Sequence, residues 1–560
     1  MAANAAPEQQ AGSTFAPFRH RIFLAMWIAA VMASFGSLIQ TVGAAWLMTS
    51  LSGSAEMVAL VQTAAGLPVA IFALAAGAIA DTYDRRRVML VALTMTFTIS
   101  VVLAICQAAG VLTAYLLLGL TFLIGCCLAL YLPAWQTSVS EQVPRDDLPA
   151  AISLNSLAIN IARSLGPAIG GAVVTIGGAA MAFATNALCY LGLIGVVAVW
   201  RRPIVANPLP RERIGPAMIT GLRYVWLSPR MRAMLVRALA FGFGGSSINA
   251  LLPLVARDLI QGGPFTYGLL LGAFGAGSVI GALSMPRLRR GMLGDSVVKY
   301  TAAAFGAAAA IVAFSPWMPL TMTALAVAGF CWVLALSTLN VTLQMAAPRW
   351  VVGRALASFQ MVLFAGVAIG SWVWGRFAEE VALSASLSVS GAVLAATMLL
   401  GSRWRVPQTP ADNLEPASAW TELDIRTEID PATGPVILFV EYAVSEERVP
   451  GFLSAMADLR QIRRRDGARR WTLLQDLADP EKWIERFESP TWADHLHRYG
   501  RGTIADREVE EQVMAFHHGA DAPRVRQLIA RDPSVGGANA APDEVPPKRL
   551  GLFAIKDIMQ

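Results

Sequence analysis

About twelve long apolar segments follow one another along this chain, and they constrain its fold more than any other feature of the sequence. Each has roughly 18–25 residues, close to the ~20 residues with which a helix crosses the ~30 Å hydrocarbon core of a bilayer. The 560 residues are 55% hydrophobic, with a mean hydropathy of +0.53. Such a composition excludes an ordinary soluble protein. We therefore predict an all-α membrane region with segments near 22–48, 57–80, 88–109, 112–136, 150–175, 179–199, 234–256, 265–286, 296–315, 318–345, 354–376 and 381–402.

The basic residues before position 420 are concentrated in alternate loops. If both chain ends lie on the same side, 22 of these 25 Lys/Arg are on that side, Arg257 and Arg376 are on the other, and Arg163 falls inside a segment. Short loops rich in Lys and Arg stay in the cytoplasm. We therefore expect a multi-pass membrane protein with cytoplasmic termini.

Charge and composition also divide the chain into regions. Residues 420–560 hold 19 Lys/Arg and 24 Asp/Glu, a net of −5, whereas the rest has a net of +11. A soluble acidic region therefore follows a basic membrane region. The predicted regions are an N-terminal tail (1–20), a six-helix half (21–200), a connector (201–232), a second six-helix half (233–405), a linker (406–430), an α+β domain (431–520) and a mostly disordered tail (521–560).

The loop after the second segment reads Gly77-Ala-Ile-Ala-Asp81-Thr-Tyr-Asp-Arg85-Arg86-Arg87. A patch that only sets topology would explain the arginines but not the carboxylate of Asp81, which opposes the dipole of a helix C-terminus. The spacing resembles the loop between helices 2 and 3 of the major facilitator superfamily. That resemblance implies a conformational latch in which Gly77, Asp81 and the arginines act with Arg354 at the start of segment 11.

Segment 5 contains Arg163-Ser-Leu-Gly166-Pro167-Ala-Ile-Gly170-Gly171. Small residues at this spacing permit close helix packing, which is one explanation of the motif. The motif also resembles the Gly-Pro-x-x-Gly-Gly of helix 5 in major-facilitator exporters, especially drug and siderophore antiporters. Further stretches at 133–136, 143–150, 251–257 and 340–344 resemble the bacterial transmembrane secretion effector group, which includes enterobactin exporter-like proteins. The resemblance covers about residues 15–405.

Arg163 lies ~13 residues, or ~20 Å, into its segment. A charge at that depth indicates substrate or gating contact, or alternatively a structural bridge to another helix. Polar residues also recur along segments 1, 7 and 10, and the resemblance implies that helices 1, 4, 7 and 10 line a central cavity. Hydrogen bonds between helices are the alternative for each amide. The candidate cavity residues are Gln40, Asn160, Arg163, Asn249, Asn340 and Gln344.

Several classes of site are not expected. We recognise no carboxylate deep in any segment, so the coupling ion stays open. The five cysteines fall within apolar segments, which favours buried packing over disulfides or zinc. We predict no catalytic residue, no metal site and no cofactor.

The acidic region alternates strand and helix patterns. We predict strands at 435–444, 470–476 and 482–487, and helices at 449–462, at 492–499 and around 509–516. This β-α-β-β-α order resembles a ferredoxin-like unit of the kind found in dimeric α+β barrel monooxygenases, although no fourth strand is recognised. His495, His497, His517 and His518 could bind metal, but their charged surroundings favour solvated histidines.

The sequence thus predicts a twelve-span major-facilitator fold followed by a small ferredoxin-like domain. The resemblance implies secondary active export of a small siderophore- or drug-like molecule across the bacterial inner membrane by alternating access. The alternative is a membrane-anchored α+β domain with a monooxygenase-like or scaffolding role. Expected partners are the substrate, the lipid bilayer and a self-associated copy or regulator bound through the α+β domain, and no nucleic acid.

Overall fold

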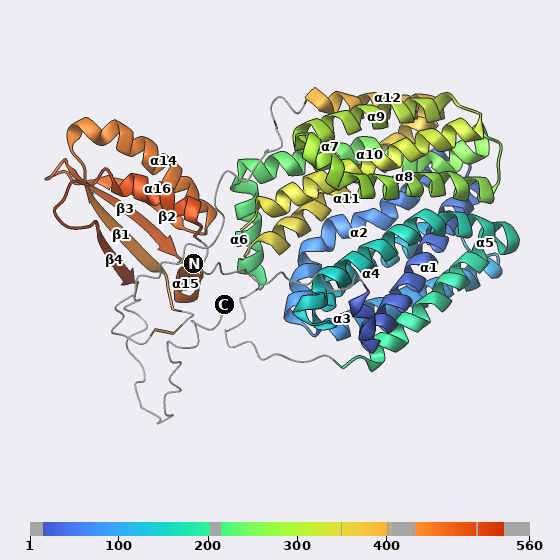
Figure 1. Cartoon of the computed structure of the whole chain (residues 1–560), viewed down its shortest axis with the longest axis horizontal. Helices are drawn as coiled ribbons and strands as arrows, with labels where there is room; N and C mark the ends of the chain where they lie inside the picture. Colours follow the sequence, from blue (N-terminus) through green and yellow to red (C-terminus); the bar gives the residue numbers. More distant parts are fainter. Residues whose placement is uncertain are drawn as a thin grey trace, which may run out of the picture. The chain divides into compact units, whose positions relative to one another are not determined.

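The computed structural model (Figure 1) describes residues 15–201, 214–348, 350–399, 404, 429–430, 433–499 and 502–530. Most of the predicted N-terminal tail, the linker, residues 202–213 of the connector and the segment after 530 lie outside these residues. The chain forms two units. The first, here the membrane unit, comprises Met1–Pro203, Pro229–Ala347 and Val351–Thr409, and the second, the sheet unit, comprises Ile204–Ser228, Pro348–Trp350 and Pro410–Gln560.

The first half of the membrane unit contains α1 (Arg21–Leu51), α2 (Ala55–Thr82), α3 (Arg85–Ala108), α4 (Ala114–Ser138) and α5 (Leu148–Val199). The 52 residues of α5 would span about 78 Å as one helix, more than twice the thickness of a bilayer core. Its backbone breaks at Gly178, where φ is 67°, a value that glycine adopts without a steric penalty. α5 therefore supplies the fifth and sixth crossings.

The second half contains α7 (Pro229–Leu254), a π turn (Val255–Leu259), α8 (Pro264–Gly291), α9 (Gly294–Phe314), α10 (Met318–Met345), α11 (Val352–Glu380) and α12 (Leu383–Ala396). Ten described helices are long and apolar enough to cross a membrane, and the apolar stretch Leu383–Leu399 is shorter. With α5 counted twice, these elements give the twelve predicted crossings. Short 3-10 turns lie at Ala16–Arg19, Val139–Glu141, Arg145–Asp147, Thr397–Leu399 and Glu446–Arg448.

Small residues allow the membrane helices to approach closely. A Cβ added at Gly125 of α4 would lie 2.7 Å from the carbonyl oxygen of Ala65 in α2. In the second half, Gly281 of α8 meets the carbonyl oxygen of Phe330 in α10 in the same way. Lipid tails are as apolar as leucine, so membrane helices associate through close packing of this kind. Large apolar side chains that face outward, such as Leu188 and Leu283, suit contact with lipid.

The sheet unit contains the connector helix α6 (Ile214–Leu227), strands β1 (Val436–Ala443), β2 (Arg469–Gln475), β3 (Lys482–Ser489) and β4 (Arg524–Ile529), and helices α14 (Val449–Arg465), α15 (Trp492–Tyr499) and α16 (Ile504–Met514). The strands form an antiparallel sheet of order β2-β3-β1-β4, in which Val436 of β1 lies opposite Ser489 of β3 and Ile529 of β4. This is the ferredoxin-like arrangement. The expectation of three strands was wrong, because β4 follows the predicted domain boundary at residue 520.

Alternation along β1 determines the core of the sheet unit. Val436, Leu438, Val440 and Tyr442 are buried, and the residues between them are half-buried. The buried face packs against α14 and α16, which cover one side of the sheet (Figure 1). The period of two therefore places the hydrophobic residues of β1 beneath the helices.

Candidate functional site

The two halves of the membrane unit meet where α5 packs against α8. Gly268 and Gly275 of α8 lie against the backbone of α5, and a Cβ at Gly268 would come 2.9 Å from the Cα of Gly171. Gly275 faces the carbonyl oxygen of Arg163. Pro167, four residues further on, has no N–H to donate to that carbonyl, so the oxygen is available to contact the Cα hydrogens of Gly275.

The glycines of the predicted helix-5 motif divide between two neighbouring helices. Gly166 and Gly170 face α1, where added Cβ atoms would crowd Leu38 and Ile39. Gly171 faces α8, where a Cβ would lie 2.7 Å from the carbonyl oxygen of Pro264. The motif therefore packs α5 against α1 of its own half and against α8 of the other half. A larger residue at any of these glycines would push the helices apart.

The side chain of Arg163 lies on an exposed face of α5, although protein surrounds its guanidinium on most sides. No hydrogen bond or ion pair in the described part of the chain involves that guanidinium. Ser156 and Ile159 are exposed on the same helix face, whereas Leu165 lies about 160° away around the helix, because each residue advances by about 100°. One exposed face thus combines Arg163 and Ser156 with the apolar Ile159, and the other carries Leu165, an arrangement that suits a helix between an aqueous path and lipid.

The other predicted cavity residues have different surroundings. Asn160 donates to the backbone oxygen of Ser156 at 2.9 Å, and Gln344 donates to Oδ1 of Asn340 at 2.5 Å. Gln344 is exposed, and Asn160, Asn249 and Asn340 are half-buried. These residues are thus at least partly accessible, as a cavity lining requires.

Gln40 is buried within the first half. Its Oε1 accepts a hydrogen bond of 2.8 Å from Ser100 of α3 and another from Asn186 of α5. Asn186 also donates to Ser100 at 2.9 Å. The three side chains therefore bond α1, α3 and α5 to one another, which is the alternative that the sequence left open for each amide.

The stripe of segment 7 consists of Gly242, Ser246, Asn249 and Pro253, and part of it faces a neighbouring helix. Gly242 of α7 packs on the carbonyl oxygen of Leu363 in α11, and Ser246 is buried beside Gly370 of the same helix. Only Asn249 of this stripe is half-buried with no described hydrogen-bond partner. Packing between α7 and α11 thus explains the first two positions.

A buried ion cluster in the second half was not predicted. Nη1 of Arg237 in α7 lies 2.6 Å from Oδ1 of Asp295 in α9, and Nζ of Lys299 lies 2.7 Å from Oδ2 of the same carboxylate. The Arg237 side chain is only 3% exposed. Arg237 falls within predicted segment 7 and Asp295 lies one residue before predicted segment 9, so no pattern within one segment pairs them.

Polar contacts between α2 and α11 join the halves at the end of the membrane unit that contains the α1–α2 and α11–α12 turns. Glu56 of α2 accepts a hydrogen bond of 3.0 Å from Nε1 of Trp372 and lies 3.4 Å from Nη1 of Arg376. Glu379 accepts from the backbone N–H of Ala55. Glu56 adjoins the start of predicted segment 2 and Arg376 ends predicted segment 11, and their opposite signs are the sequence signal that could have paired them.

The predicted latch residues lie at the opposite end of the unit. Arg85 lies 2.6 Å from Glu141, and Arg86 donates to the backbone oxygens of Val197 and Ala198, so both arginines bond within the first half. Arg87 is exposed, and a Cβ at Gly77 would meet nothing within 4 Å. The Asp81 side chain lies outside the described part of the chain. Arg354 is half-buried in the first turn of α11.

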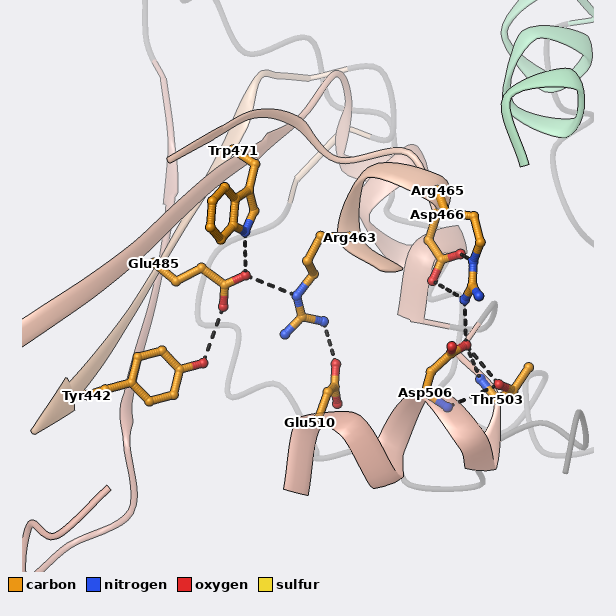
Figure 2. Close-up of polar contacts among 9 residues, drawn as sticks. All are labelled: Tyr442, Arg463, Arg465, Asp466, Trp471, Glu485, Thr503, Asp506 and Glu510. Atoms are coloured by element: carbon orange, nitrogen blue, oxygen red, sulfur yellow. Dashed lines mark hydrogen bonds and ion pairs between the residues drawn. The ribbon is translucent and has the colours of Figure 1, made fainter. Parts of the chain in front are cut away.

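The sheet unit has a polar core of its own, shown in Figure 2. The fully buried carboxylate of Glu485 accepts from Nε1 of Trp471 at 2.9 Å, from Nε of Arg463 at 3.3 Å and from the hydroxyl of Tyr442 at 3.3 Å. Arg463 also pairs with Glu510 of α16. Burial and the Glu485 carboxylate raise the pKa of Tyr442 well above its usual value, so this hydroxyl stays protonated as a donor.

The histidines of the sheet unit are not simply solvated. His495 is fully buried, and burial, with the charge of Arg498, lowers its pKa to about 4. Nδ1 of His517 accepts the backbone N–H of Ala443 at 2.9 Å. The expectation of solvated side chains was therefore wrong for these two residues. The described residues contain no group of three His, Cys, Asp or Glu side chains placed to hold a metal ion.

Comparisons with known proteins agree with this architecture. The chain is 27% identical over 374 residues to the multidrug efflux pump Tap of Mycolicibacterium fortuitum, which covers 65% of this chain and 90% of the pump. It is 27% identical to the enterobactin exporter EntS of Salmonella choleraesuis over 64% of this chain and 87% of the exporter. The staphyloferrin A transporter of Staphylococcus aureus is 23% identical over 45% of this chain and 64% of that protein.

Solved transporter structures share the fold of the membrane unit. The POT family transporter PepTSo superposes with a TM-score of 0.59 at 13% identity, over 69% of this chain and 97% of the transporter. The nucleoside transporter NupG superposes with a TM-score of 0.54 at 13% identity, over 68% and 98% of the two chains. The profile of the transmembrane secretion effector family matches residues 12–534. The chain therefore belongs to the transmembrane secretion effector family and has the twelve-span fold of major-facilitator transporters.

Proposed function

We propose that this protein exports a small polar or anionic organic molecule, of the siderophore- or drug-like class, by alternating access. The similar proteins named as a multidrug pump, an enterobactin exporter and a staphyloferrin A transporter support the substrate class. The two six-helix halves, joined through α5–α8 and α2–α11, suit the rocking of one half against the other.

The observation that carries the proposal is the position of Arg163. A guanidinium is protonated at every physiological pH, so deep in a membrane it needs an anion, carbonyl oxygens or water. Among the described residues, no anion and no carbonyl oxygen bonds to the Arg163 guanidinium, and the side chain is accessible. A water-filled path, and an anionic or polar substrate within it, would compensate this charge. The half-buried side chain of Asn160, on the same helix, would add an amide to that path.

We also propose that both termini and the sheet unit are cytoplasmic. The Arg85–Arg87 loop and the basic residues of α6 and early α7 then lie on the cytoplasmic side. The α2–α11 contacts around Glu56 lie on the outer side. Labelling of Ser52→Cys, but not of Ser418→Cys, by an impermeant thiol reagent in cells with an opened outer membrane is the expected result. Labelling of Ser418→Cys alone would reverse the orientation.

The last turns of α2, which contain Gly77 and Asp81, are proposed to act as a latch with Arg354 when the cytoplasmic side closes. The unfavourable position of a carboxylate at the C-terminal end of α2 supports an external cationic partner. The open space beside Gly77 leaves room for another helix to approach. A closing motion that brings α11 to these turns would use both features.

We assign the sheet unit a regulatory or self-association role rather than a catalytic one. The polar core around Glu485 supports this assignment, because Tyr442, Trp471 and Arg463 all bond to the same carboxylate instead of facing an open site. A monooxygenase-like activity of this domain is the competing assignment. Turnover of a small aromatic substrate with O₂ by the purified protein would favour it.

Transport in inverted inner-membrane vesicles tests the proposed function. Vesicles with the protein should accumulate the exported molecule from a panel of siderophores and drug-like metabolites, assayed with and without a proton gradient. Vesicles with the Arg163→Ala variant at equal abundance should not. If no compound accumulates with the wild-type protein, while the sheet unit turns over a substrate, the membrane-anchored enzyme becomes the better account.

A further inference from the structure

Two segments of the membrane-region sequence belong to the sheet unit. One is the connector helix α6, which ends at Leu227 and is separated from the start of α7 by Ser228 alone. The other is the turn Pro348–Trp350, which lies between the end of α10 at Met345 and the start of α11 at Val352. The sheet unit is therefore attached to the chain immediately before two membrane helices, in addition to its linker.

The contact between α14 and α6 uses the end of α14. Cζ of Arg465 lies 4.7 Å from the centre of the Tyr224 ring, and Nη2 of Arg223 donates to the carbonyl oxygen of Ala468 at 3.0 Å. Gly467, with φ of 111°, allows the chain to turn at the end of α14 so that Ala468 donates to the carbonyl oxygen of Arg463 at 2.9 Å. This glycine-dependent turn presents the Ala468 carbonyl to α6.

Arg465 is held in place by two carboxylates (Figure 2). Its Nε donates to Asp466 at 3.0 Å, and its Nη2 donates to Asp506 at 2.7 Å. Asp506 also forms the capping box of α16 with Thr503. The guanidinium over Tyr224 thus has a fixed orientation, which reduces the entropy lost on forming the cation–π contact.

Tyr224 connects this cluster to Trp350, which stands two residues before the start of α11 in the sequence. The Tyr224 and Trp350 rings lie 5.2 Å apart at an interplanar angle of 80°, an edge-to-face contact. Both rings belong to the sheet unit, and Tyr224 is 3% exposed. Trp350 stands four residues before Arg354, the arginine at the start of α11 to which the latch proposal assigns the pairing with Asp81.

We propose that the surface formed by Arg465 and Ala468 is a docking surface for α6, and that docking positions Arg354 through Tyr224 and Trp350. Arg465, Tyr224 and Trp350 are then positioning residues for the cytoplasmic latch. The proposal rests on the transport function proposed above. It makes the sheet unit an intramolecular regulator, since release of α6 loosens the start of α11, weakens the latch and favours the cytoplasm-open state.

Spin labels can measure this effect in the full-length protein. With the five native cysteines replaced, labels at Ser140→Cys and Leu293→Cys, both exposed and on opposite halves, report the separation of the cytoplasmic ends. Arg465→Met keeps an unbranched apolar stem but removes the charge and the guanidinium donors, and Tyr224→Leu removes the ring. Each should raise the ratio of long to short label distances about two- to fivefold, as expected for loss of one cation–π contact.

Two matched substitutions serve as controls. Trp226→Leu replaces an aromatic residue of α6 that is 64% exposed, and Arg460→Met removes a cation–π contact with Trp471 inside the sheet unit. Neither should change the distance ratio. Hydrogen exchange of the α6 amides should rise in Arg465→Met and Tyr224→Leu but not in the controls, which shows whether α6 has been released.

The Asp81→Asn background distinguishes an effect of α6 docking that acts through the latch from an effect that is independent of the latch. If docking acts through the latch, Arg465→Met should cause no further shift once Asp81→Asn is present. Release of α6 with unchanged label distances would overturn the proposal, and so would a full additional shift in the Asp81→Asn background. Arg465→Met could unfold α16, and hydrogen exchange of the α16 amides would reveal this. In that case Tyr224→Leu decides, because it leaves the ion pairs of Arg465 with Asp466 and Asp506 intact. A single label distance in every variant, together with no accumulation of any compound in inverted vesicles, would instead count against the transport function itself.

Discussion

Arg163 of α5 and Arg237 of α7 both lie within membrane segments, but the protein surrounds them differently. Arg237 is 3% exposed and pairs with Asp295 at 2.6 Å. Arg163 has an accessible side chain and no described hydrogen-bond or ion-pair partner. The fold thus compensates one charge internally and leaves the other to water or to a ligand. Depth in a segment indicates that an arginine matters, and its partners indicate whether it serves structure or transport.

Arg237→Ala should produce the largest loss of stability. It removes the guanidinium that lies 2.6 Å from the buried carboxylate of Asp295, which we expect to cost about 3 kcal/mol. Thermal unfolding in detergent measures the effect. Lys299→Ala, whose side chain is more exposed, should cost less than Arg237→Ala. An unchanged midpoint in Arg237→Ala would show that this pair does not stabilise the second half.

Arg163→Ala should have the opposite effect, with transport falling at least about thirtyfold and the unfolding midpoint unchanged, because no buried counter-charge is left behind. Arg163→Lys should lose less, since lysine keeps the charge but not the planar fork of donors. Vesicle transport at equal abundance and thermal unfolding give the two readouts. Instability of Arg163→Ala that is rescued by a neutral substitution elsewhere would make this residue a structural bridge like Arg237.

Asp81, a charge at the end of a helix, can be compared with the two membrane arginines through Asp81→Asn. We expect transport to fall about tenfold, with substrate binding retained, because a lost ion pair of the latch changes the conformational equilibrium and not the binding site. Equilibrium binding of the exported molecule and vesicle transport, measured on the same preparation, test this. Parallel losses of binding and transport would place Asp81 in the binding site instead.

His495 shows a third way to bury a basic group, which is to give up the charge. Its pKa is lowered to about 4 from the usual 6.5, so the unfolded chain binds a proton that the folded sheet unit excludes. The stability is therefore complete above about pH 6.5 and is lost as the pH falls toward 4. Between pH 7.5 and 5.5, hydrogen exchange of α15 should report a loss of about 1 kcal/mol. His495→Gln should remove this pH dependence, and the exposed His518→Gln should keep it.

The sequence predicted the crossings well because they depend on local patterns, and the helix-5 motif is recognised from a local pattern too. The apolar runs are long, and the glycines of α5 and the depth of Arg163 can be counted along one segment. Partners are harder to predict, since Arg237 and Asp295 are 58 residues apart and the relevant pairing depends on how α7 crosses α9. Gln40 illustrates the same limit, because its amide stripe is equally compatible with a cavity and with the bonds to Ser100 and Asn186.

The strand β4 was missed for a related reason. Its six residues include three charged or amide side chains and follow a turn rich in polar residues, so no alternation stands out. Pairing with β1, whose sequence lies almost ninety positions earlier, defines it as a strand. The association of α6 with the sheet unit likewise depends on contacts between Tyr224, Arg465 and Trp350, which no local pattern reveals.

The most direct test of the account is the accessibility of position 163. In a cysteine-free background, Arg163→Cys and Leu165→Cys place thiols on the two exposed faces of α5, two residues apart. An impermeant thiol reagent added to the cytoplasmic side of inverted vesicles should label Arg163→Cys and leave Leu165→Cys unlabelled. Labelling at Leu165→Cys with protection at Arg163→Cys would contradict the claim that Arg163 lines the transport path.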